Sequence, residues 1–440
     1  MPSKPVMAII SARLYGQDGV SIEARKWEQA FRQLGYEPFL IAGKMPEIET
    51  PHMVIPLMSL EHPEVLAIDE LAFEVELDGE GQHALLERID ALAQEIKSQL
   101  RQTLVEQGVL AMNIENALAV PMNLPLGVAL HELILEDGVP TVARHHDFYW
   151  ERERFLNSNV ASLLQMTFPP DIPWMAHVTI NNRAQQALKQ RRGIEARWFA
   201  NFFDFSSIQA FDGYNEDLRQ TLGLGSGDLF FLQPTRIVER KCIERSIELI
   251  ARLREEYGLH GPLVITGPAE NGGDWYCREV VQPAAQRHGV TLIRADSYFD
   301  SKREIVDRKK LYAIGDAYVH ADLVTFPSDF EGFGNPVIEA AMYRVPLFVN
   351  CYPVLKDLQR LVDKPFKFIT IDGVVTHEAV AEVYHILTDP SARRTMVNHN
   401  FRVAKEHFSM EMLTRRLESL LESLGLPCQG LRAGQPPLGE

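Results

Sequence analysis

Short runs of apolar residues alternate along the chain with segments in which apolar residues recur three and four positions apart. Runs of this kind, bounded by turn residues, are typical of buried parallel strands, and the segments between them are typical of helices that cover a sheet. Six runs lie in the first half of the chain, at 6–11, 38–42, 109–114, 140–147, 176–180 and 195–200, and six in the second half, at 229–235, 262–267, 291–295, 323–328, 346–350 and 366–371. The pattern predicts an α/β protein with two parallel sheets.

The chain is long enough for two domains, because 440 residues exceed what one hydrophobic core usually spans. Between 201 and 228 the alternation pauses, and polar and glycine residues collect before a new strand begins. We therefore predict an N-terminal domain at 1–212 and a C-terminal domain at 213–410.

Two further segments have a recognisable pattern. Glycines at 223, 225 and 227 imitate a dinucleotide-binding fingerprint, but that fingerprint opens a helix and a strand follows here, so we predict a turn. Near the C-terminus the leucines of 411–426 recur three and four positions apart, which predicts a closing helix. Residues 427–440 are predicted to be a disordered tail.

The charge of the chain is acidic and uneven. The formal net charge is −16, and residues 1–212 hold 17 Lys and Arg against 29 Asp and Glu, a balance of −12. An acidic first half argues against duplex nucleic acid or an anionic membrane as the main partner, although a local basic pocket can still bind a phosphate.

The four cysteines are isolated in sequence, so neither zinc spacing nor a disulfide framework is indicated, and a reducing cytosol fits best. Arg13 directly follows the first apolar run, which favours a first strand over a signal peptide. The most apolar longer stretch, at 109–135, is too polar and too broken by proline for a membrane span. We expect a cytoplasmic protein without stable membrane insertion; the oligomeric state is not readable from the sequence.

The candidate chemistry centres on "DFEGFGNPVIEA" at 329–340, which follows a predicted strand. Its glycines free backbone N–H groups at the start of a helix entered near Pro336, which makes the loop receptive to an anion. Glu331 and Glu339 are good acceptors for hydroxyl groups, so a ligand with both phosphates and hydroxyls, such as a nucleotide sugar, would use all of these groups. On spacing alone, a turn-capping Glu331 and a solvent-facing Glu339 explain the pattern equally well.

This segment closely resembles the E-x7-E motif of retaining glycosyltransferases, family 4 in particular, and of their glycogen-synthase-like relatives. The preceding "LYAIGDAYVHADLVTFPS" is similar to the lead-in of the same family. The resemblance implies the GT-B architecture, in which two Rossmann-like domains face each other across a cleft and a C-terminal helix returns to the first domain. It also implies that Glu339 holds ribose hydroxyls, Glu331 sugar hydroxyls, and the amides of Phe333, Gly334 and Asn335 the sugar and phosphate oxygens.

A second match lies at 230–253, where Arg236 and Lys241 occupy the family's Arg-x4-Lys positions. Two fixed cations after a strand suit a diphosphate leaving group, whereas a solvated Arg/Lys pair is the structural alternative. Cys242 stands where many relatives have glycine. The segment 263–272 resembles the next strand and its glycine turn, which places Gly267 near the donor.

The first half matches less sharply. After the first strand, Gly19 stands at the second position of the family's glycine loop, where it would contact the donor. In "GVPTVARHHDFYWERERF" a histidine at a strand end is expected to face the sugar: His146 is the first choice, and His145 the alternative. A metal site and a plain packed histidine are the competing interpretations of this run.

Acceptor contacts are expected, from position alone, at Asn113, Glu115 and Asn116 after another strand, with His145 as a further candidate. The resemblance implies a retaining enzyme that moves a hexose from a UDP- or GDP-sugar to a hydroxyl of a small soluble acceptor or glycan. Its expected catalytic residues are Glu331, His146, Arg236 and Lys241, with no cofactor and no metal. A sugar phosphorylase, a nucleotide-sugar epimerase and a non-catalytic nucleotide-sugar binding module are the alternatives.

Overall fold

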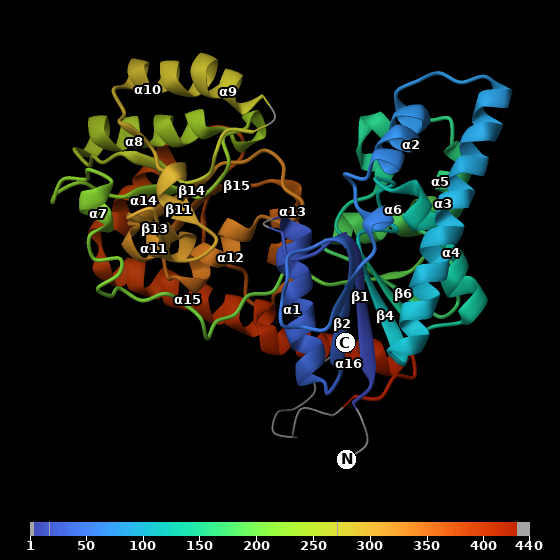
Figure 1. Ribbon diagram of the computed structural model, residues 1–440. Helices are drawn as coiled ribbons and strands as arrows, with labels where there is room; N and C mark the ends of the chain where they lie inside the picture. The colour runs from blue at the N-terminus through green and yellow to red at the C-terminus, as the bar shows by residue number, and fades with distance from the viewer. Residues whose placement is uncertain (1–3, 17, 271, 429–440) are drawn as a thin grey trace. The chain divides into compact units, whose positions relative to one another are not determined.

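The computed structural model describes residues 4–16, 18–270 and 272–428, and the chain divides into two compact units (Figure 1). Unit 1 comprises the residues up to Phe202 and those from Met410 onward, and unit 2 runs from Phe203 to Ser409. The division therefore lies before the expected 212/213 boundary, because residues 203–212 associate with the second unit. From residue 429 on, the predicted tail lies outside the described residues.

Unit 1 is built on a seven-stranded parallel sheet in the order β3-β2-β1-β4-β5-β6-β7. Its strands are β1 (Val6–Arg13), β2 (Glu37–Lys44), β3 (His52–Val54), β4 (Val109–Glu115), β5 (Thr141–His145), β6 (Met175–Thr179) and β7 (Ala196–Trp198). Six of these strands coincide with the predicted apolar runs, and β3 is an addition at the sheet edge.

Alternate residues of β1 face two separate cores, as the two-residue period of a strand requires. Met7 and Ile9 pack with helices α1 (Gly19–Gln33) and α16 (Met410–Ser423), whereas Ala8 and Ile10 pack on the opposite side. The helices on that opposite side are α2 (Pro63–Phe73), α3 (Gly79–Glu106), α4 (Leu124–Asp137) and α5 (Ala161–Thr167). A further helix, α6 (Asn182–Arg192), connects β6 to β7.

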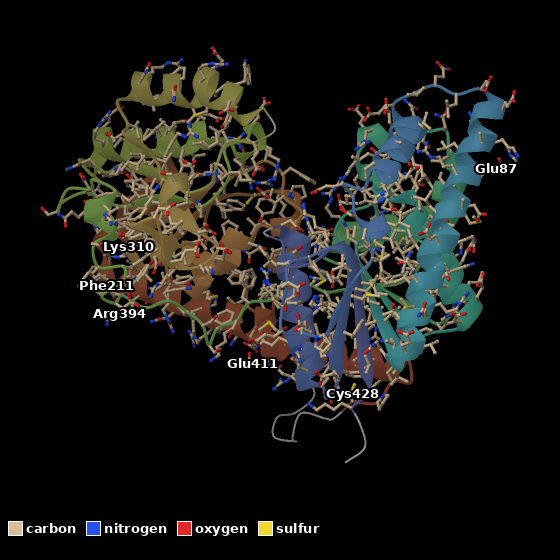
Figure 2. The ribbon with its side chains drawn as sticks, in the orientation of Figure 1. Glu87, Phe211, Lys310, Arg394, Glu411 and Cys428 are labelled. Carbon is tan, nitrogen blue, oxygen red and sulfur yellow. The ribbon has the colours of Figure 1, made fainter. Side chains whose placement is uncertain are left out.

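The closing helix is part of unit 1, as predicted. Leu413, Leu417 and Leu420 of α16 are buried in one cluster with Trp27 and Phe31 of α1, and Figure 1 shows the two helices within this unit. The long helix α3 is amphipathic in the same way: Leu85 and Ile89 are buried, whereas Glu87 is exposed and labelled in Figure 2.

Unit 2 contains a six-stranded parallel sheet in the order β10-β9-β8-β14-β15-β16. Its strands are β8 (Phe231–Gln233), β9 (Leu263–Ile265), β10 (Leu292–Arg294), β14 (Leu323–Phe326), β15 (Leu347–Asn350) and β16 (Ile369–Ile371), all of them predicted runs. A small additional sheet joins β11 (Phe299–Asp300), β13 (Lys309–Ala313) and β12 (Glu304–Val306).

Helices on unit 2 bury the sheet as expected for this class. One core joins the sheet to α8 (Ile243–Tyr257), α10 (Gln282–His288) and α14 (His377–Thr388), and α12 (Asn335–Met342) packs against β14, β15 and α15 (Pro390–Phe408). The remaining helices are α7 (Leu218–Thr221), α9 (Gly273–Tyr276), α11 (Ile314–His320) and α13 (Pro353–Leu361). No helix among the described residues combines the length and the apolar composition that crossing a membrane would need.

Candidate functional site

Each large sheet has one place where the order of its strands reverses. In unit 1 this place lies between β1 and β4, and in unit 2 it lies between β8 and β14. Ligands of open α/β sheets bind beyond the carboxyl ends of the strands at such a switch point, because the loops that follow the two strands diverge there. Gly19 follows β1, Asn116 follows β4, and the segments of Lys241 and Glu331 follow β8 and β14, whereas His146 follows β5 and Gly267 follows β9.

In unit 2 the loop after β14 leads into α12 through Gly334. This glycine has a φ of 95°, and a Cβ atom built on it would lie 2.1 Å from the hydroxyl oxygen of Tyr352. The Tyr352 hydroxyl donates a hydrogen bond to the carbonyl oxygen of Phe333 at 3.0 Å. Only glycine therefore fits this position, and the packed tyrosine holds the loop that carries Glu331.

Glu331 and Lys241 form a buried ion pair at the switch point of unit 2. The Lys241 ammonium donates to Glu331 Oε1 at 2.5 Å, and the Arg240 guanidinium donates to Glu331 Oε2 at 2.8 Å. The side chains of Lys241 and Glu331 are 8% and 9% exposed. Burial lowers the pKa of Lys241, while the negative charge of Glu331 opposes that shift. The structure thus brings together one predicted acid and one predicted cation.

Arg236 precedes Lys241 in the same segment and is half exposed, with its guanidinium 2.5 Å from the Glu270 carboxylate. A Cβ atom on Gly267 would lie 2.5 Å from the carbonyl oxygen of Thr235, so Gly267 allows the loop after β9 to approach the loop of Arg236 closely. A pocket of about 580 Å³ is lined by three arginines and three acids, which are Arg236, Arg240, Arg245, Glu239, Glu244 and Asp329.

Cys242 caps the start of α8 with a left-handed backbone, at φ 48°. This conformation is the one that glycine adopts without strain, which accounts for the glycine expected at this position in the resembling family. The chain places Lys241 just before this turn, so the turn directs the lysine toward Glu331.

The second acid of the motif, Glu339, is half buried on α12 and accepts a hydrogen bond from the Tyr318 hydroxyl at 2.7 Å. Tyr318 stacks on Tyr343, with ring centroids 5.2 Å apart. Phe333 is 4% exposed, so it can offer a ligand its backbone but not its ring. Asn335 is the first residue of α12.

In unit 1, Glu115 and Asn116 lie at the end of β4 beside His146. His146 Nε2 lies 3.4 Å from Glu115 Oε2, and the His146 backbone N–H donates to Asn116 Oδ1 at 2.9 Å. Asn116 also donates to Asp147 at 3.1 Å. Glu115 and Asn116 line a pocket of about 180 Å³. These contacts join a carboxylate, an amide and an imidazole at one strand end.

Asn113 is fully buried and donates to Glu115 Oε1 at 2.9 Å, so it orients Glu115 and does not make the expected direct acceptor contact. Arg144 was not predicted as a site residue. It is fully buried, its Nη2 lies 3.0 Å from Glu23, and its Nη1 lies 3.6 Å from Glu115. Burial alone would raise the pKa of Glu115, but Arg144 and the hydrogen bond from His146 hold it below its usual value.

His145, the alternative to His146, is turned into the core, so its expected contact with the acceptor is wrong. It is 1% exposed, and its Nε2 is 3.0 Å from Nδ1 of the buried His177. Burial lowers the pKa of His145 well below its usual value and lowers that of His177 to about 4. Both rings are neutral at physiological pH and serve packing.

This histidine pair makes the stability of the protein depend on pH. Above the unfolded value of 6.5 the two histidines are neutral in both states, whereas at lower pH the unfolded chain binds protons that the folded chain excludes. We expect the free energy of unfolding to fall by about 1 kcal/mol per pH unit for each of the two histidines as the pH drops from about 6 to about 5.

Urea denaturation across this pH range measures the slope. The variant His177→Gln keeps a hydrogen-bonding group but removes one titrating ring, so its slope is expected to be smaller than that of the wild type. Equal slopes in the two proteins would contradict this account.

Gly19 is the first residue of α1, and a Cβ atom built on it would meet no described atom within 4 Å. The open space beside it is compatible with the predicted contact to a ligand. Asp18 caps the helix by accepting from the Ser21 backbone at 3.1 Å.

One group with the geometry of metal ligands occurs among the residues described, Asp363, Glu406 and His407, of which the two acids are exposed. None of them belongs to the predicted site. In the His-His-Asp run at 145–147, the alternative metal site, His146 contacts Glu115, and Asp147 contacts Asn116 and Arg152.

Comparison with known proteins places the chain among sugar-transferring enzymes. No protein-family model matches it. The chain is similar to mannosylglucosylglycerate synthase from Thermotoga maritima, at 31% identity over 96% of this chain and 100% of that protein. The same synthase from Petrotoga mobilis is 28% identical over 92% of this chain and 99% of its own length.

Solved structures share the fold at low sequence identity. A glycosyltransferase from Rickettsia africae matches with a TM-score of 0.64 and 12% identity, over 96% of this chain and 98% of its own. HepE from Anabaena, solved with UDP and glucose, matches with a TM-score of 0.63 and 14% identity, over 96% of this chain and 100% of its own. Sucrose-phosphate synthase from Thermosynechococcus elongatus matches with a TM-score of 0.63 and 14% identity, over 96% of this chain and 99% of its own. The predicted GT-B class, with two Rossmann-like domains, is confirmed.

Proposed function

The chain belongs to the mannosylglucosylglycerate synthase family, and from that premise we propose that it transfers a mannosyl group from a nucleotide-diphosphate sugar to a hydroxyl of glucosylglycerate, with retention of configuration. It is a glycosyltransferase. The identity of the sugar and the acceptor is taken from the name of the relatives. The observation that carries the proposal is the Lys241–Glu331 ion pair at the switch point of unit 2.

The reaction breaks the bond between the anomeric carbon and the phosphate oxygen and forms a bond from that carbon to the acceptor oxygen. Negative charge grows on the diphosphate as it leaves, and fixed cations stabilise that charge without rearranging. In this proposal Lys241 and Arg240, which both donate to Glu331, supply that charge, together with Arg236 from the same segment between β8 and α8. The acceptor proton passes to the departing phosphate oxygen on the same face.

The acids of the motif hold hydroxyl groups in this proposal. Glu331 accepts from the sugar and Glu339 from the ribose, with Tyr318 keeping the Glu339 carboxylate in place. The roles that the resemblance implies for His146 and Gly19 of unit 1 remain predictions; within that unit His146 contacts Glu115, and Gly19 leaves open space at the start of α1.

The release of nucleotide diphosphate from a panel of sugar donors tests the proposal. GDP-mannose, UDP-glucose, UDP-galactose and ADP-glucose are each incubated with and without glucosylglycerate. We expect release from the mannose donor, stimulated by the acceptor. Cleavage that depends on inorganic phosphate would favour a phosphorylase, a change of the sugar without an acceptor would favour an epimerase, and nucleotide binding with no release would favour a binding module.

We further predict that transfer needs no divalent metal. In this proposal Lys241, Arg240 and Arg236 donate to the leaving diphosphate in place of a divalent ion. Turnover is therefore expected to be unchanged after treatment with EDTA and after later addition of Mg²⁺ or Mn²⁺. Loss of activity with EDTA that Mg²⁺ restores would contradict this prediction.

A further inference from the structure

The pocket of unit 1 is lined by arginine side chains whose role the proposed function leaves unexplained. It lies between the ends of β1 and β4 and has a volume of about 180 Å³. Such a volume suits one small organic group and is below the usual range for pockets that hold a drug-sized ligand. Arg13, Asp18, Glu115, Asn116 and Arg152 line it together with apolar residues.

The two arginines are held by acids but keep part of each guanidinium uncommitted. Arg13 contacts Asp18 through Nε at 3.1 Å, and Asp18 is in turn anchored by the Ser21 hydroxyl at 2.8 Å. Arg152 contacts Asp147 through Nε and Nη2, at 2.8 and 2.5 Å. Among the described residues, the Met122 sulfur, at 3.8 Å, is the only hydrogen-bond partner of Arg152 Nη1, and Met122 also lines the pocket.

Acids on neighbouring residues thus fix the direction of both guanidinium groups without filling their hydrogen-bonding capacity. The side chains of Arg13 and Arg152 are 44% and 40% exposed, so a ligand in the pocket can reach them. A guanidinium offers only hydrogen-bond donors and binds a carboxylate through two of them in a forked geometry. A neutral hydroxyl group needs no such pair of charged donors.

Glu115 supplies the opposite sign in the same pocket. Although burial raises its pKa, Arg144 and His146 hold that pKa below the usual value, so the carboxylate is ionised and repels an anion. A ligand with a carboxylate at one end and hydroxyls at the other therefore has one favourable orientation. The Glu115 side chain is itself fully buried, so the hydroxyls lie toward the partly exposed Asn116, and the carboxylate lies toward the arginines.

We propose that this pocket is the acceptor subsite and that Arg13 and Arg152 bind the carboxylate of the glycerate group, which makes the enzyme selective for an acidic acceptor. The inference rests on the proposed function, since it assumes a glucosylglycerate acceptor. It adds two specificity-determining residues that lie outside the E-x7-E and Arg-x4-Lys segments. Residues 1–212 carry a net charge of −12, from 17 basic and 29 acidic side chains, which repels an anionic acceptor, so the two guanidinium groups give such an acceptor a local contact of opposite sign.

The test compares glucosylglycerate with glucosylglycerol, in which a neutral CH₂OH group replaces the carboxylate. For the wild type, kcat/KM is expected to be at least about tenfold higher with glucosylglycerate, the value of one charge-assisted hydrogen bond. In the double variant Arg13→Gln/Arg152→Gln this ratio is expected to fall toward one, mainly through a higher KM for glucosylglycerate.

A matched control removes two arginines of the same unit outside the pocket, Arg88→Gln and Arg183→Gln, and is expected to keep the wild-type ratio. A ratio near one in the wild type, or an unchanged ratio in the pocket variant, would overturn the inference while leaving mannosyl transfer intact. Transfer to neither acceptor by the wild type would instead overturn the proposed function and the inference with it. The wild-type ratio of kcat/KM for the two acceptors can still overturn the inference if the pocket variant does not fold.

Discussion

Replacing Glu331 with glutamine is expected to lower kcat/KM for transfer by about a hundredfold or more, the usual effect of removing one preorganised electrostatic contact. The carboxylate accepts from both Lys241 and Arg240, and an amide cannot accept from both of its atoms. The same change leaves Lys241 buried without an anion, so we also expect the free energy of unfolding to fall by about 3 kcal/mol. Steady-state kinetics and urea denaturation measure the two effects.

A double variant separates the two effects of Glu331→Gln. Glu331→Gln/Lys241→Gln has no buried unpaired charge at this position, so part of the lost stability is expected to return while transfer stays low. If activity returned together with stability, neither Glu331 nor Lys241 would act in transfer. Wild-type turnover in Glu331→Gln would remove Glu331 from the site.

Replacing Lys241 with glutamine is expected to reduce kcat by about a hundredfold to a thousandfold, because the leaving diphosphate loses its most buried cation. Arg240 still neutralises Glu331 in this variant, since it contacts the other carboxylate oxygen. The binding of nucleotide diphosphate is expected to weaken as well. Single-turnover kinetics and calorimetric titration with GDP and UDP provide the measurement.

The matched control is Arg278→Gln, which removes an exposed cation of unit 2 that contacts only the adjacent Glu279 among the residues described. It is expected to keep wild-type kcat. Equal losses in both variants would mean that the general charge of unit 2, and not the position of Lys241, governs turnover.

The strands of both large sheets were predictable because long apolar runs signal strands that are buried on both faces. β3 was missed because three residues at a sheet edge are too few to show a period, and two of them are exposed. The small sheet of unit 2 was missed for a related reason, since β12 and β13 contain the charged residues Glu304, Lys309 and Lys310. The 212/213 boundary was placed too late because residues 203–212 carry no period that assigns them to either unit.

The ion pair of the site was predictable in its residues but not in its geometry. The motif singled out Glu331 and Lys241, whereas their direct contact depends on two loops that are 90 residues apart in sequence. Arg240 stands inside the Arg-x4-Lys spacing, and no rule of spacing marks it. Its contact with Glu331 becomes visible only in the folded loop.

For Arg144 of unit 1, in contrast, the sequence did contain a signal that it belongs to the site. Arg144 is a charged residue inside the apolar run 140–147, and a charge on a buried strand needs a buried partner. Its partners, Glu23 and Glu115, come from a helix and a strand far apart in the chain. The choice between His145 and His146 depended on which of them turns into the core at the end of β5, and it is His145, which contacts His177 of the neighbouring strand.

The most direct test of the central claim is the configuration of the product made from GDP-mannose and glucosylglycerate. The one-bond coupling between carbon and hydrogen at the anomeric centre, measured by NMR, distinguishes an α- from a β-mannoside. Because the donor is α-linked, a retaining transferase built on Glu331, Lys241 and Glu339 yields an α-mannosyl glucosylglycerate. A β-linked product, or a product in which mannose is not joined to glucosylglycerate, would contradict the account.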